Sequence, residues 1–324
     1  MATVSLGKTS LSGVTLSPSS TSSTTKTTTT TKTPEEQFKD LQQQFIKGNI
    51  SGEDFAKQAK ELGYNVTVNT NAIQLPKVAD LQAQKAELQR LYNIAKNAGN
   101  KTKAEEYSGQ IDQIDQMISI VNSKATTASK KAQIAKLIGF DGTPVSPTDI
   151  LGANIITLNA QIAFTDSSAC TSSPATKSRV KGYLTNLKNE YQKALDKIKN
   201  SNLSTSEIES LFASLETKSN SISNNSMVKS VLKEMPDKIA NGEFEKAEEK
   251  TRAPLDTEKV PDWAKNLPKW LQRMVNDKGE GSYRDLLLLI GGYALCTFIP
   301  GAALVGGVFT GLSGLAIAGA ILQD

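Results

Sequence analysis

The helical fold of this chain is decided by residues 78–124, with the sequence VADLQAQKAELQRLYNIAKNAGNKTKAEEYSGQIDQIDQMISIVNSK. Apolar residues recur at helical spacing in both halves of the stretch, first as Leu81, Leu88, Leu91 and Ile94, then as Ile111, Ile114, Met117, Ile118 and Val121. Asn97-Ala98-Gly99-Asn100 between the halves is a turn sequence. We therefore expect a helical hairpin whose arms are about 30 Å long. Such a thin hairpin has to pack against the rest of the chain or against other subunits.

Helix-start signals extend the helical pattern in both directions. Thr33-Pro34-Glu35-Glu36 is a capping box with proline at the first helical position, and it opens an expected two-helix module over residues 34–64. Ser204 to Glu207 is a second capping box, within an expected helical region over 178–252. Together these signals predict a mainly α protein built of elongated helical hairpins or a coiled-coil-like bundle.

Two stretches between the helical units lack a clear period. Residues 65–77 are rich in Asn, Val and Thr, and we expect a linker there. Residues 125–177 are expected to form an irregular, partly helical linker, because their apolar residues follow no single period. Cys170 lies near the end of this second stretch, in a Ser/Thr-rich loop sequence, and we expect it to be an exposed free thiol.

The first 33 residues contain 20 Ser or Thr and no acidic residue. Such a composition cannot bury enough apolar surface to offset its ordering entropy, so a disordered tail is expected over 1–33. A delivery leader for an export or injection system is the alternative. A cleaved secretory signal is not expected, because the stretch has no continuous apolar core and no basic start.

Composition excludes several classes of function. The chain has 37 Lys+Arg against 33 Asp+Glu, a net charge of +4, so a strongly basic nucleic-acid binder is not expected. It has no histidine, which excludes histidine triads and histidine metal sites. Its two cysteines, Cys170 and Cys296, rule out a disulfide scaffold and a cysteine-rich zinc site. We expect no enzyme, with no catalytic, cofactor-binding or metal-binding residues and no nucleic-acid partner.

Residues 285–324 are the most apolar part of the chain. Leu286 to Leu322 is 37 residues without one charged side chain, and only Pro300-Gly301 interrupts it strongly. As helices the two arms would be about 21 Å and 33 Å long, against a hydrocarbon core of about 30 Å. We therefore expect a hydrophobic membrane hairpin that turns at Pro300-Gly301, and a buried hairpin in a soluble core is the alternative.

Small residues within the longer arm are spaced by four: Ala303, Gly307 and Gly311. This spacing predicts a groove that permits close helix packing, although glycine is also generally frequent in membrane helices.

The segment before the hairpin, residues 260–284, has the pattern of a membrane-interface helix. Both tryptophans of the chain, Trp263 and Trp270, fall on one helical face of this segment. Three basic residues fall on the other face: Lys265, Lys269 and Arg273. Tryptophan with Lys or Arg behind it is typical of a segment lying in the headgroup layer. A tryptophan pair in a soluble core is the alternative.

The layout, carried by Trp263 to Leu322, resembles that of pore-forming colicins, of translocator proteins secreted by injection machines, and of virion proteins that phages eject into the cell envelope. The resemblance implies a non-enzymatic protein that inserts its hydrophobic hairpin into a lipid bilayer. It implies a membrane-associated location, reached by secretion or injection without a cleaved signal, or from a larger assembly. The helical seams would bind a second copy or other proteins. A membrane-anchored helical scaffold is the alternative function.

Overall fold

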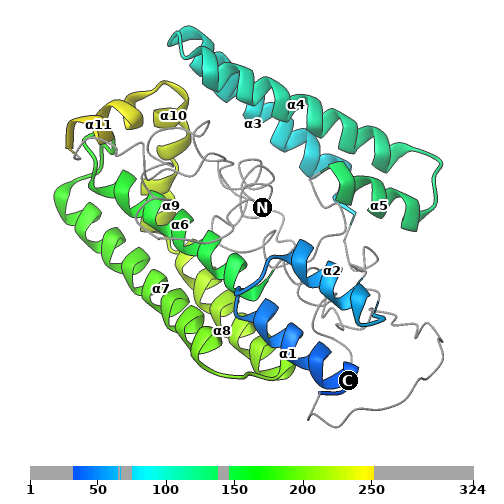
Figure 1. Ribbon diagram of the computed structural model, residues 1–324. Helices are drawn as coiled ribbons and strands as arrows, with labels where there is room; N and C mark the ends of the chain where they lie inside the picture. Colours follow the sequence, from blue (N-terminus) through cyan, green and yellow to red (C-terminus); the bar gives the residue numbers. More distant parts are fainter. Residues whose placement is uncertain (1–31, 65, 67–74, 138–145, 252–324) are drawn as a thin grey trace.

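The computed structural model describes residues 32–64, 66, 75–137 and 146–251. Over these ranges the protein is mainly helical and contains no strand, which confirms the predicted fold class (Figure 1). The helices are α1 (Pro34–Ile46), α2 (Gly52–Glu61), α3 (Val78–Asn97), α4 (Lys101–Asn122), α5 (Thr127–Leu137), α6 (Pro147–Asp166), α7 (Pro174–Asn200), α8 (Thr205–Ser223), α9 (Ser226–Leu232), α10 (Met235–Ala240) and α11 (Glu243–Thr251). The expected tail over residues 1–33, apart from Lys32 and Thr33, and the expected C-terminal hairpin lie outside these ranges.

Both capping boxes are present. The Thr33 hydroxyl accepts a hydrogen bond from the Glu36 amide at 3.2 Å, and the Glu36 carboxylate accepts one from the Thr33 amide at 2.7 Å. Ser204 and Glu207 make the same pair of bonds at 3.4 and 2.8 Å. Each box satisfies backbone donors that a helix start would otherwise leave unpaired, so it fixes where α1 and α8 begin.

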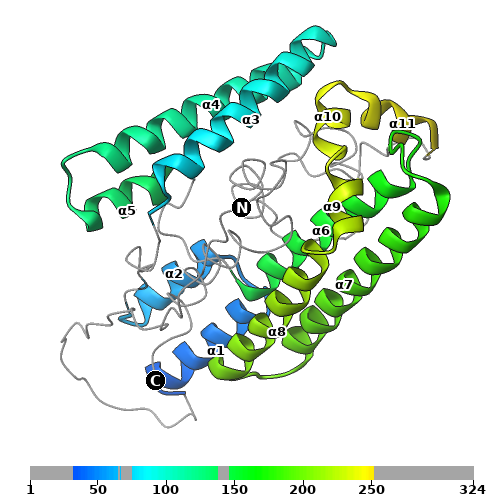
Figure 2. The ribbon, with the colours of Figure 1, turned by 180° about the vertical axis from the view of Figure 1, so that it is seen from behind.

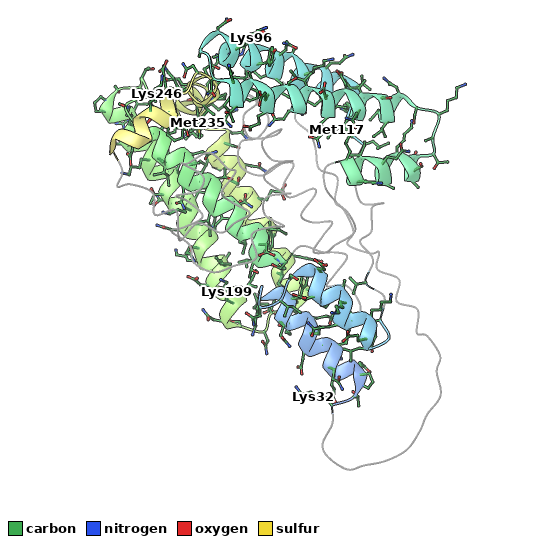
Figure 3. The ribbon with its side chains drawn as sticks, turned by 45° about the horizontal axis from the view of Figure 1, so that its top comes forward. Lys32, Lys96, Met117, Lys199, Met235 and Lys246 are labelled. Carbon is green, nitrogen blue, oxygen red and sulfur yellow. The ribbon has the colours of Figure 1, made fainter. Side chains whose placement is uncertain are left out.

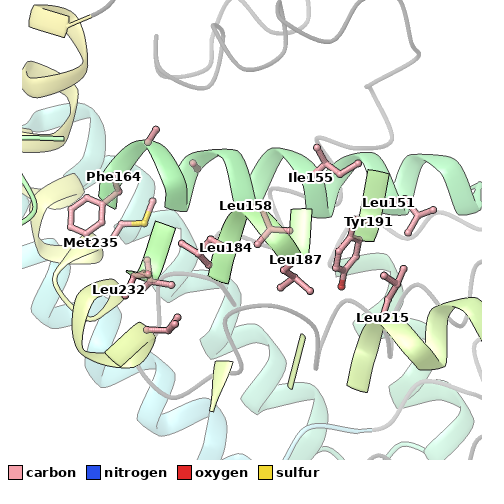
Figure 4. Packing of buried hydrophobic residues seen from close by; sticks show 14 of the residues in the cluster. Leu151, Ile155, Leu158, Phe164, Leu184, Leu187, Tyr191, Leu215, Leu232 and Met235 are labelled. Atoms are coloured by element: carbon pink, nitrogen blue, oxygen red, sulfur yellow. The ribbon is translucent and has the colours of Figure 1, made fainter. Parts of the chain in front are cut away.

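The largest hydrophobic core lies between α6 and α7, and α8, α9 and α10 complete it (Figure 4). α7 contributes one regular stripe of buried residues: Val180, Leu184, Leu187, Tyr191, Ala194 and Ile198. α6 contributes Leu151, Ile155, Leu158 and Phe164. At the far end of the core, Phe164 meets Phe244 of α11 edge-on, with ring centroids 5.6 Å apart. A seam of this length holds the two long helices side by side.

The helix α6 falls within the stretch expected to be an irregular, partly helical linker. It is 20 residues long, with proline at its first position and a Ser146 cap. Apolar residues are distributed around the helix, and its buried polar residues include Asn154 and Gln161. A helix buried on most sides has no polar face, so its periodicity gives no amphipathic signal.

α3 and α4 lie side by side as a long hairpin, and α5 folds back along the free end of α4 (Figures 1 and 2). The seam of the hairpin buries Leu81, Leu88, Leu91, Ala95, Tyr107, Ile114 and Met117. Gly99 ends the turn with φ of +72°, a conformation that a side chain would strain. The hairpin makes its contact with the main bundle through α10.

α1 and α2 form a small module with its own aromatic cluster of Phe38, Phe45 and Phe55. The module attaches to the main bundle through the turn between its helices. Ile46 joins the main core, and the Lys47 ammonium donates to the Asn202 amide oxygen at 2.6 Å. Gly48 in this turn has φ of +71°, and a Cβ there would lie 2.3 Å from the Thr148 hydroxyl. Glycine is therefore required at this position by both conformation and space.

Candidate functional site

The residues that the sequence singles out for membrane contact all lie within residues 252–324, outside the described ranges. They are Trp263, Lys265, Lys269, Trp270 and Arg273 of the interface segment, Pro300 and Gly301 of the turn, and Ala303, Gly307 and Gly311 of the packing groove. Their assignment stays a prediction from the sequence. Among the helices from α1 to α11, none combines the length and the apolar character needed to cross a bilayer.

Within the described ranges, acidic and cysteine side chains do not gather into groups of three that could hold a metal ion. The charged residues instead form pairs along the helix surfaces, such as Lys85 with Asp115 at 2.6 Å and Lys103 with Glu106 at 2.5 Å. The first pair links α3 to α4, and the second lies within α4.

Cys170 corrects one sequence expectation. We expected an exposed thiol, but Cys170 is 3% exposed and belongs to the main core. The loop that follows is held by Glu234, whose carboxylate accepts hydrogen bonds from the Thr171 amide at 2.9 Å and the Thr171 hydroxyl at 2.7 Å. Because Glu234 lies 63 residues further along the chain, sequence spacing gives no signal of this contact.

The contact between the hairpin and the main bundle combines an ion pair, a neutral hydrogen bond and the buried Ala240. Arg90 of α3 donates to Glu87 on its own helix at 2.6 Å and also to Asp237 of α10. The two carboxylates raise the pKa of the Arg90 guanidinium still further above its ordinary value. At the turn of the hairpin, the Asn100 amide donates to the Ala240 carbonyl at 3.2 Å. These bonds fix the angle at which the hairpin leaves the bundle.

A buried tyrosine lies beneath this ion cluster. Tyr107 of α4 is 2% exposed, and its hydroxyl has no hydrogen-bond partner among the described residues. Burial raises the pKa of the Tyr107 phenol, and the neighbouring Glu106 and Asp237 raise it further. A phenol that stays neutral in this position acts as part of the hairpin seam.

Sequence reasoning missed the docking of the hairpin on α10. The local signals at that site are the Met235-Pro236 helix start and the Asn241-Gly242 turn, where Gly242 has φ of +78°. Figure 3 shows the result: α3 and α4 lie across the end of the bundle that carries Met235 and Lys246, while α1 and α2 lie at the end near Lys199.

Comparisons of the chain with protein-family models, with curated proteins and with solved structures find no match.

Proposed function

We propose that this chain is a non-enzymatic membrane-inserting protein, in which a water-compatible helical body accompanies a C-terminal hydrophobic hairpin that enters a lipid bilayer. The observation that carries the proposal is the run from Leu286 to Leu322, 37 residues without a charge. Its longer arm matches the thickness of a hydrocarbon core. In this proposal Trp263 and Trp270 lie in the headgroup layer, and the protein is delivered soluble or from a larger assembly.

The helical body supports the proposal because its composition differs from that of the charge-free run. Its helices bury their own apolar stripes, and Tyr183 is the one large hydrophobic side chain exposed among the described residues. A body with so little exposed apolar surface is suited to water. The charge-free run has no such balance of polar and apolar residues, so lipid is the environment that its composition favours.

The test is insertion of the full-length chain into vesicles. The parent protein should cause vesicles to release a trapped dye. Part of the protein should also stay bound to the vesicles after carbonate extraction. Leu312→Lys, near the middle of the longer arm, should cost about 2.5–3.5 kcal/mol of insertion and so abolish both. Circular dichroism should show that the helices of the body are retained.

A matched control adds the same charge elsewhere. Ala213→Lys on the exposed side of α8 changes the net charge equally and should leave leakage and insertion unchanged. If Leu312→Lys inserts and leaks as the parent does, the run is not in lipid and the proposal fails.

A membrane-anchored scaffold is the second candidate, and the α3–α4 hairpin favours it. Ile94, Ile111 and Ile118 are only partly buried beside the hairpin seam. Partly buried apolar side chains on both helices are suited to further packing against a second copy or another helical protein. A protein that is always extracted from membranes, and that never releases dye from vesicles, would belong to this class.

A further inference from the structure

The outer helix α7 is where the positive charge of this protein gathers. It carries seven basic residues: Lys177, Arg179, Lys181, Lys188, Lys193, Lys197 and Lys199. Its acidic residues are Glu190 and Asp196. The excess of five exceeds the net charge of the whole chain, +4, so the other residues together are slightly acidic. The charge is therefore concentrated on a single helix about 40 Å long.

Helix α7 presents this charge to solvent. It lies at the outer edge of the bundle in both opposite views (Figures 1 and 2), and its buried stripe faces α6 and α8. Lys177 and Lys181 lie on the side of α6, where they contact the Ser167 carbonyl at 2.9 Å and the Asp166 carboxylate at 2.7 Å. Lys193 lies on the other side, with Glu190, which also pairs with Lys218 of α8. Basic residues therefore follow both edges of the helix.

Four of the seven cations have no carboxylate within ion-pair distance in the described part of the chain. Arg179, Lys197 and Lys199 are exposed and Lys188 is half-buried. Lys197 and Lys199 lie in the last helical turn, where they also favour the helix dipole. That explanation does not extend to Arg179 and Lys188, which lie in the first and middle parts of the helix.

A second observation on the same helix is Tyr183, which is 36% exposed. It follows Arg179 by one helical turn, so the two side chains are neighbours on the surface. The outermost positions between the two basic edges carry mainly small or polar residues, Ser178, Gly182, Thr185 and Asn189. One acid lies on the same line, Asp196, and it accepts a hydrogen bond from the Gln192 amide at 2.9 Å. A helix with basic residues along both edges, and with an exposed tyrosine beside one of them, is suited to a surface of negative headgroups, where tyrosine is favoured.

We propose that the outer face of α7 docks the helical body on a bilayer surface that contains anionic lipid. The proposal rests on the membrane-inserting function above and adds the lipid class and the side of the body that meets it. Docking by α7 is peripheral and precedes insertion, so high salt reverses it, whereas insertion of the hairpin resists both salt and carbonate.

The test uses the full-length chain and co-sedimentation with two kinds of vesicle, phosphatidylcholine alone and phosphatidylcholine with phosphatidylglycerol. We call the protein that sediments with vesicles at low salt but is released at high salt the salt-releasable fraction. This fraction should form on the phosphatidylglycerol vesicles only. It should disappear when the salt is raised until the Debye length is a few ångströms. Equal salt-releasable binding of the unmodified chain to both vesicles at low salt would overturn the proposal without any variant being needed.

The variant removes the four cations that have no carboxylate within ion-pair distance: Arg179→Gln, Lys188→Gln, Lys197→Gln and Lys199→Gln. Each charge near an anionic surface changes the binding constant about fivefold, so the four together should weaken salt-releasable binding by about a hundredfold or more. A matched control removes four exposed lysines far along the chain from α7: Lys57→Gln, Lys60→Gln, Lys101→Gln and Lys124→Gln. If the control loses as much binding as the α7 variant, net charge and not this face is responsible.

The two proposals fail separately. Leu312→Lys should remove the carbonate-resistant fraction and leave the salt-releasable fraction on phosphatidylglycerol intact. If Leu312→Lys removes the salt-releasable fraction as well, docking depends on the hairpin and the assignment to α7 is overturned. If it leaves the carbonate-resistant fraction unchanged, the insertion proposal fails while the docking measurement stands.

Discussion

Replacing Phe55 with alanine should open the α1–α2 module without unfolding the main bundle. Phe55 is completely buried and stacks on Phe45, with ring centroids 4.6 Å apart. A second ring, Phe38, lies 6.0 Å away. Removing a buried phenylalanine side chain typically costs about 3–5 kcal/mol, because the cavity collapses only in part.

The magnitude matters because the module is small. Its cluster contains five buried residues. The module is also shorter than about 40 residues, the length below which a domain rarely folds alone. Its attachment to the bundle adds Ile46 and the bond from Lys47 to Asn202. The loss of about 3–5 kcal/mol exceeds the free energy that so small a cluster can contribute against local unfolding, so α1 and α2 should open locally.

Amide hydrogen exchange with peptide-level resolution measures this outcome. Peptides from α1 and α2 should exchange rapidly in Phe55→Ala, while peptides around Leu184 and Leu187 of α7 keep the protection of the parent. Phe55→Leu, which keeps most of the apolar volume, should give a much smaller change. If α7 loses protection together with α1, the module and the bundle are one cooperative unit and the reasoning is refuted.

Two further outcomes follow from buried groups. Burial raises the pKa of Tyr191 to about 12 from its ordinary value of 10.0, so the unfolded chain releases this proton first. The contribution of Tyr191 to stability should therefore be complete below pH 10.0 and lost as the pH rises towards about 12. The difference in free energy of unfolding between the parent and Tyr191→Phe, measured by denaturant unfolding, should be constant below pH 10.0 and should change only across that window. Cys170 is buried in the main core, so in a Cys296→Ser background, which removes the other thiol, it should react with a thiol reagent only on unfolding. Reaction at the rate of a small-molecule thiol would show that the loop held by Glu234 opens readily.

Sequence reasoning reached the parts of this fold that local patterns encode. The two capping boxes at Thr33 and Ser204 and the apolar stripes of the α3–α4 hairpin all depend on residues a few positions apart, and each is present. The turn at Gly99 is of the same kind. Periodicity gave no amphipathic signal at α6, because a helix apolar on most sides has no polar face to reveal its period.

Contacts between distant residues gave no signal in the sequence. Arg90 and Asp237 are 147 positions apart, and neither belongs to a recognisable motif. Cys170 was misjudged for the same reason, since Glu234 folds its loop onto the core from 63 positions away. The residues predicted for membrane contact rest on composition alone, because they lie beyond the last described residue.

The pairing of Arg90 with Asp237 also sets the order in which the molecule can be assembled during synthesis. The α3–α4 hairpin closes through a short turn, so it can form as soon as residues 78–122 leave the ribosome. The helix on which it docks, α10, is not complete until residue 240 has been synthesised. For the time between, the nascent chain carries a finished hairpin whose ionic cluster is incomplete. That interval is when a chaperone or a neighbouring copy would find Arg90 unpaired with α10.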